Sequence, residues 1–125
     1  MKIVLKKEKV IPFDFDGLKG EFVCESPKAS EHVSFWAGYR AIEGTEEIKA
    51  EKQAEMVTSK FLNSIKEINF TEETTFEEDG TNKLMDPKTA LAEYYSIPIY
   101  HIGLKYLTPN FGGSETDPLG VNSKG

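Results

Sequence analysis

Few side chains in this sequence are suited to nucleophilic or metal chemistry: one cysteine, Cys24, and two histidines, His32 and His101. A nucleophilic triad requires Ser or Cys, His and an acid brought together, and a metal site requires ligands at short, patterned spacings. Neither histidine has such a spacing, and the sequence contains no Gly-x-Ser-x-Gly elbow and no phosphate-binding loop. Cys24 has no base near it in the sequence, so we expect it to be a small buried hydrophobic residue in a strand. The sequence therefore predicts a protein that is not an enzyme and binds no cofactor.

The acidic side chains also lack the pattern of a known site. Residues 77–82, Glu-Glu-Asp-Gly-Thr-Asn, place oxygen ligands before a glycine as a calcium loop does, but the alternating acids and closing glutamate of an EF-hand are missing. The acid pairs at 46–47, 72–73 and 77–78 are adjacent in sequence. Adjacency does not indicate that they converge in a cleft, as catalytic carboxylates must. We predict no metal site.

Charge narrows the class of partner. The formal net charge is −6 and the chain has a single arginine, Arg40, so we predict no nucleic-acid binding. The charges are also partly segregated, because residues 1–20 hold five lysines against three acids and residues 66–93 hold three lysines against eight acids. This asymmetry suits head-to-tail association into a homo-oligomer or a basic protein partner. An ordinary solvated surface is the competing interpretation.

Length and composition predict one domain over residues 1–109 and a flexible tail over residues 110–125, which are rich in Gly, Ser and Asn. There is no run of 18 apolar residues, so no membrane association is expected. The apolar stretch at the N-terminus is too short for a signal peptide. The expected location is the cytoplasm.

Residues 2–25 are predicted to form a small antiparallel meander of two or three strands. Residues 3–5 are apolar and mostly β-branched, and within residues 10–15 every second side chain from Ile11 is apolar. Residues 21–25 form the return strand after an Asp16-Gly17 turn. A sheet of this size is unstable unless helices cover it.

Two helices are predicted to follow. The first covers residues 30–42 from a Ser30 N-cap and is apolar on two faces, which is typical of a helix packed between two layers. A strand over residues 33–39 is the alternative. The second helix begins after Thr45 and carries one apolar stripe at helical spacing. The stripe consists of Ala50, Ala54, Val57, Phe61, Ile65 and Ile68.

The last predicted elements are two helices joined at a proline-marked break. Asp86 and Pro87 have the chemistry of an N-cap and a first helical position, and Ser96-Ile97-Pro98 interrupts the helix that they open. A further helix covers residues 99–107. The predicted fold class is α+β, with a small N-terminal antiparallel β-meander packed against a mainly α-helical C-terminal part.

These last helices are rich in tyrosine, which combines a large apolar area with a polar tip and is enriched in interfaces. Packing in the core is the competing interpretation of each side chain. Together the two helices offer more apolar surface than a small domain can bury, so some of it should contact a partner. The predicted partner-binding residues are Tyr94, Tyr95, Ile99, Tyr100, Leu104 and Phe111.

Several segments occur in a characteristic order. Strands that end at Ser26-Pro27 precede a helix with an apolar end at residues 61–70 and an acidic Glu78-Asp79-Gly80 stretch. The pattern Ala-Leu-x-x-Tyr-Tyr-x-x-Pro at residues 90–98 and a final helix at residues 99–107 follow. In this order and rough length, most of the chain resembles the tail assembly chaperones of long-tailed bacteriophages.

The resemblance implies a non-enzymatic protein that coats the long tape-measure protein, keeps its apolar helices soluble and recruits tail-tube subunits. It also implies residence in the host cytoplasm and absence from the mature virion. A structural virion protein, such as a tail-tube or head–tail component, is the alternative. A small ligand-binding protein or enzyme is the third possibility.

Overall fold

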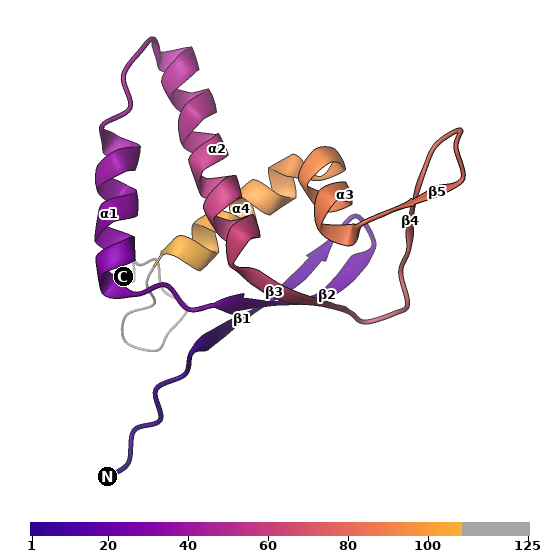
Figure 1. Cartoon of the computed structure of the whole chain (residues 1–125), viewed down its shortest axis with the longest axis horizontal. Helices are drawn as coiled ribbons and strands as arrows, with labels where there is room; N and C mark the ends of the chain where they lie inside the picture. Colours follow the sequence, from indigo (N-terminus) through magenta and orange to yellow (C-terminus); the bar gives the residue numbers. More distant parts are fainter. Residues whose placement is uncertain (109–125) are drawn as a thin grey trace, which may run out of the picture.

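The computed structural model describes residues 1–108, and the predicted tail with Phe111 lies outside them. The strands are β1 (Glu8–Phe15), β2 (Leu18–Glu25), β3 (Ile65–Phe70), β4 (Phe76–Glu78) and β5 (Lys83–Met85). The helices are α1 (Ala29–Arg40), α2 (Glu46–Ser64), α3 (Pro87–Tyr94) and α4 (Ser96–Leu107). The fold is α+β, as predicted, with the sheet at the N-terminal end and helices over one of its faces (Figure 1).

The sheet is antiparallel in the order β1-β2-β3. The predicted Asp16-Gly17 turn joins β1 to β2, and both residues have positive φ, +50° and +82°, as a tight hairpin turn of this kind requires. The third strand does not come from residues 2–25, because β3 adds to β2 after two intervening helices. A two-residue turn sets the first pairing locally, whereas the second depends on how α2 packs.

The predicted strand at residues 3–5 is wrong. The chain is extended there but pairs with no strand that the structure describes, because β2 ends at Glu25, opposite Glu8. The Ser26 N–H still donates to the Lys7 carbonyl oxygen at 2.9 Å. Beyond that bond the N-terminal residues project away from the sheet (Figure 1).

The core lies between the inner face of the sheet and the helices α2 and α4. Alternate residues of β1 and β2 point inward, so that Ile11, Phe13, Phe22 and Cys24 are buried. The Phe22 and Phe61 rings meet edge to face, with their centroids 5.2 Å apart. The helices add further buried residues to this layer: Val57, Ala90, Leu91, Ile99, Tyr106 and Leu107.

The apolar stripe of the second helix ends earlier than predicted. Helix α2 stops at Ser64 and the chain continues directly into β3, so Ile65 and Ile68 lie in a strand. The register with β2 shifts between Val23 and Cys24, which pairs Cys24 with Ile65 and Phe22 with Ile68. Two strand residues three apart normally face opposite sides, but this bulge turns both isoleucines toward the core. Their spacing therefore resembled helical periodicity.

The expectation that the first helix packs between two layers is also wrong. Helix α1 has no buried residue and lies beside α2 as its antiparallel neighbour (Figure 1). Phe35, Trp36 and Tyr39 are half-buried and pack against the edge of the core. The Gln53 side-chain amide donates to the Tyr39 carbonyl oxygen at 3.1 Å, which ties α1 to α2.

The predicted Ser30 N-cap is wrong, because α1 begins at Ala29 and has Lys28 at its N-cap. The predicted caps of α2 and α3 are confirmed. The Thr45 hydroxyl accepts from the Ile48 N–H at 3.2 Å, and the Asp86 carboxylate accepts from the Thr89 N–H at 3.1 Å. Pro87 is at the start of α3, as predicted. The break between the last two helices falls at Tyr95, earlier than predicted, so residues 96–98 form the first turn of α4. Among residues 1–108, no helix combines the length and apolar composition needed to cross a membrane.

Replacing Phe22 tests the placement of the core. Phe22→Ala should lower the free energy of unfolding by about 3–5 kcal/mol, because it removes a fully buried ring and leaves a cavity between β2 and α2. Val33→Ala is the control, since Val33 is 67% exposed on α1 and its loss should change stability by less than about 0.5 kcal/mol. Urea unfolding of the three proteins measures both values, and equal stabilities would contradict this core.

Candidate functional site

Cys24 belongs to a small set of polar groups that joins the sheet to α4. The Lys9 ammonium donates to the Tyr106 carbonyl oxygen at 2.9 Å and lies 5.6 Å from the centre of the Tyr106 ring. The Tyr106 hydroxyl donates to the Glu25 carbonyl oxygen at 2.6 Å. These bonds hold the last turn of α4 against β1 and the end of β2. Their role is structural.

The Cys24 thiol itself is poorly suited to nucleophilic chemistry. It is fully buried, and burial raises its pKa above the usual value, although Ser64 and the lysine charges of Lys9 and Lys88 oppose the rise. Burial lowers the pKa of Lys9, an effect that the Cys24 charge opposes. A thiol that retains its proton is a weak nucleophile. The prediction that Cys24 is a buried hydrophobic residue in a strand is confirmed.

The two histidines lie on different helices and do not meet. His32 is half-buried in the first turn of α1, with its ring 6.1 Å from that of Trp36. His101 is exposed on α4 next to Tyr100. Among the residues that the structure describes, no group of three or more His, Cys, Asp or Glu side chains could hold a metal ion.

The feature best suited to binding is an open groove between α2 and the junction of α3 with α4. Its volume is about 750 Å³ and its surface is mostly apolar. The apolar lining consists of Ala54, Leu62, Ala92, Ile97 and Tyr100. Glu51 and Glu55 add carboxylates from α2, and the remaining lining residues are neutral and polar. We call this feature the α2–α4 groove.

The structure separates the six predicted contact residues. Tyr100 lines the α2–α4 groove, and Tyr94 is exposed at the end of α3. Tyr95 is half-buried on another side, with its ring 5.7 Å from that of Phe15. Leu104 is half-buried and packs against the core.

Ile99 is fully buried between α4 and the rest of the core, so it offers no surface to a partner in this fold. Phe111 lies outside the described residues. Of the five predicted contact residues that the structure describes, only Tyr100 lines the groove.

Ile97 is the groove residue that was not among the predicted contacts. It is 71% exposed, an unusual position for an isoleucine, and it lies one helical turn before Tyr100. The signal was its i, i+3 spacing to Tyr100, which places both side chains on the same side of α4, away from Ile99. Choosing it required knowing which face of α4 was buried.

Comparison with known protein families, with characterised proteins and with solved structures finds no significant match. The function of the chain must therefore be inferred from its own residues and from the groove.

The buried thiol predicts a specific dependence of stability on pH. The folded state holds the Cys24 proton more tightly than the unfolded state, so its stabilising contribution is lost as pH rises above the ordinary thiol pKa of 9.0. Between about pH 8 and about pH 10, the free energy of unfolding should fall more steeply for the wild type than for Cys24→Ala. Lys9 and Tyr106 also titrate at alkaline pH, but they are present in both proteins.

Urea unfolding at several pH values measures the two slopes. Identical slopes in the two proteins would show that the thiol is not held in its protonated form by burial.

Proposed function

We propose that this chain is a non-enzymatic tail assembly chaperone of a long-tailed bacteriophage. In this function it binds apolar helices of the tape-measure protein and recruits tail-tube subunits. The observation that carries the proposal is the α2–α4 groove. In this groove Ile97 and Tyr100 of α4 are accessible to a partner, although the protein as a whole is acidic. The sequence resemblance supplies the identity of the partners.

The groove suits an amphipathic helix as its ligand. Such a helix binds by placing its apolar face in a groove lined with aliphatic and aromatic side chains. Ile97 and Tyr100 supply adjacent anchors from α4, and Leu62 supplies apolar surface from α2. Large apolar side chains that are exposed before binding and buried afterwards are the usual centre of such an interface.

The acidic side of the groove adds a preference for basic partners. Glu51 and Glu55 are exposed on α2 and line the groove. Lysine or arginine side chains beside the apolar face of a partner helix would pair with them, mainly increasing the rate of association at low salt. Each contact of this size is weak, and many weak contacts along one long helical partner give strong but reversible coverage.

A chaperone that works in this way leaves its partner when assembly is complete. The proposed location is therefore the host cytoplasm, and the mature particle should lack the chain. Mass spectrometry of purified particles would separate this function from that of a tail-tube or head–tail component, because a structural protein is retained in stoichiometric amounts.

Replacing Ile97 tests the groove directly. Ile97→Glu should weaken binding to the tape-measure protein by about 30-fold, because it places a charge among groups that the partner helix must desolvate. The measurement is the fraction of co-expressed tape-measure protein that remains soluble, followed by titration with the purified complex components. The fold should be retained, since Ile97 is not part of the core.

Val33→Glu is the matched control, because Val33 is a similarly exposed apolar residue on α1 and does not line the groove. The control should bind as the wild type does. If both variants kept the tape-measure protein soluble, or if the wild type failed to do so, the proposed function would be wrong.

A further inference from the structure

The N-terminal residues 1–7 form an extended arm with an apolar centre and a basic composition. Ile3, Val4 and Leu5 are 71%, 69% and 84% exposed. The arm carries Lys2, Lys6 and Lys7 and no acid. Its backbone continues β1 past the end of β2. Apart from the Lys7 carbonyl oxygen, which accepts from the Ser26 N–H, its N–H and C=O groups have no strand partner among the described residues. An exposed, extended apolar segment with unpaired backbone groups is a template for pairing with a strand.

The hairpin of β4 and β5 has the complementary properties. It is a separate two-stranded ribbon, and such ribbons are marginally stable by themselves. Phe76 attaches it to the body through Phe70, whose ring centroid is 5.9 Å away. Leu84 is 68% exposed in the centre of the ribbon. Within residues 1–108, β4 pairs only with β5, which leaves the outer edge of β4 open.

We propose that the arm of one copy of this chain adds to the outer edge of β4 in a second copy, as a third strand of the hairpin. Strand addition satisfies the unpaired backbone groups of both partners, and side chains set the specificity. The arm brings lysines to a strand that carries Glu77 and Glu78, and opposite charges on neighbouring strands are favourable. The other edge is less suitable, because β5 carries Lys83.

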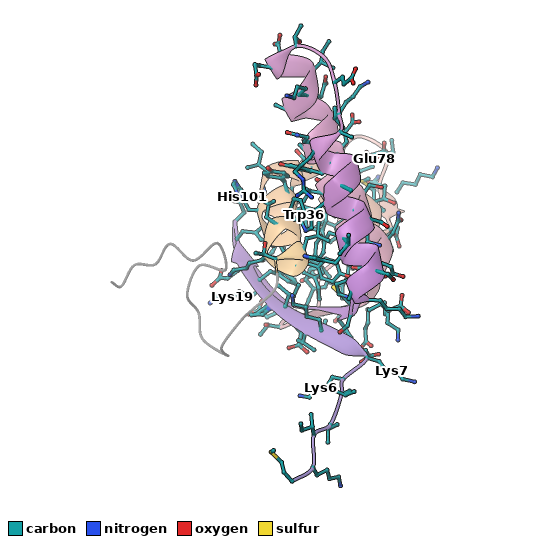
Figure 2. All side chains as sticks on the ribbon, turned by 90° about the vertical axis from the view of Figure 1, so that its left-hand side faces the viewer. Lys6, Lys7, Lys19, Trp36, Glu78 and His101 are labelled. Atoms are coloured by element: carbon teal, nitrogen blue, oxygen red, sulfur yellow. The ribbon has the colours of Figure 1, made fainter. Side chains whose placement is uncertain are left out.

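The arrangement of the molecule favours pairing between copies. The arm and the hairpin project from opposite ends of the structure (Figure 1). Figure 2 shows the same separation from the side, with Lys6 and Lys7 at one end and Glu78 far from them. A symmetric pairing of two arms is disfavoured, because it would bring six lysines together without an acid.

The contact has a consequence for assembly. An arm at one end and its acceptor at the other make a head-to-tail interface, which gives open chains of copies or closed rings, and not a simple two-fold dimer. The contact does not use the α2–α4 groove, since none of the groove residues lies in the arm or the hairpin. A chain of linked copies would present many grooves to one long partner, so this inference extends the proposed function without depending on it.

Paired charge reversals test the proposal. One variant combines Lys6→Glu with Lys7→Glu, and the other combines Glu77→Lys with Glu78→Lys; all four residues are exposed, so both variants should fold. Sedimentation velocity of the wild type should show oligomers that grow with concentration and weaken with salt. Each variant alone should associate at least about tenfold more weakly, because like charges then face each other.

Two combinations should restore association. A mixture of the two variants matches a basic arm to an acidic hairpin and an acidic arm to a basic one. A single chain with all four substitutions matches its own copies in the same way. In the restored assemblies and in the wild type, the backbone amides of Ile3, Val4 and Leu5 should exchange hydrogen more slowly than in the separate variants.

Other outcomes would overturn the proposal. A wild type that stays monomeric up to about 1 mM has no such interface. Loss of association in the arm variant but not in the hairpin variant would mean that the arm binds elsewhere. Loss of self-association in the Ile97→Glu variant would mean that the arm binds in the α2–α4 groove instead. Failure to bind the tape-measure protein would contradict the proposed function alone, because sedimentation does not use that partner.

Discussion

The structure depends on the contact between α2 and the inner face of the sheet. Phe22 and Phe61 are the largest fully buried side chains and meet edge to face, so they hold the helix against the sheet. Helix α4 then packs against α2 at Gly103, where a Cβ atom would lie 3.0 Å from a methyl group of Val57. Because α2 continues directly into β3, the same contact also positions the third strand.

The helices cover only one face of the sheet, so this core buries only part of the apolar surface of the chain. Helix α1 has no buried residue, Ile97 and Tyr94 are exposed, and the arm carries three exposed aliphatic side chains. A small domain has limited volume in which to bury such groups. The exposed apolar groups are distributed among the α2–α4 groove, the arm and the hairpin, and each of these has charged residues beside it. Exposed apolar surface rimmed by polar residues is typical of surfaces that contact a partner.

The parts of the fold that the sequence predicted are those in which neighbouring residues decide the conformation. The Asp16-Gly17 turn, the Thr45 and Asp86 caps and the break near Pro98 each depend on a few adjacent residues. The candidate site was predicted less well. Tyr100 was identified as a contact, but Ile97 was not, and Ile99 proved to be buried. Composition can show that α4 has more apolar residues than one face needs, but it cannot show which face is turned inward.

By itself, the sequence determined the fold class, the β1–β2 hairpin, the Thr45 and Asp86 caps and the acidic, single-arginine composition. The tertiary structure decided that Ile65 and Ile68 belong to a strand. A bulge in the pairing of this strand with β2 turns both side chains toward the core. Within residues 1–108, it also decided that residues 3–5 have no partner strand and that the α2–α4 groove is open. The reason is that turns and caps form hydrogen bonds over three or four residues, whereas β3 pairs with residues more than forty positions earlier in the chain. Such pairing depends on the packing of α2, which no local pattern encodes.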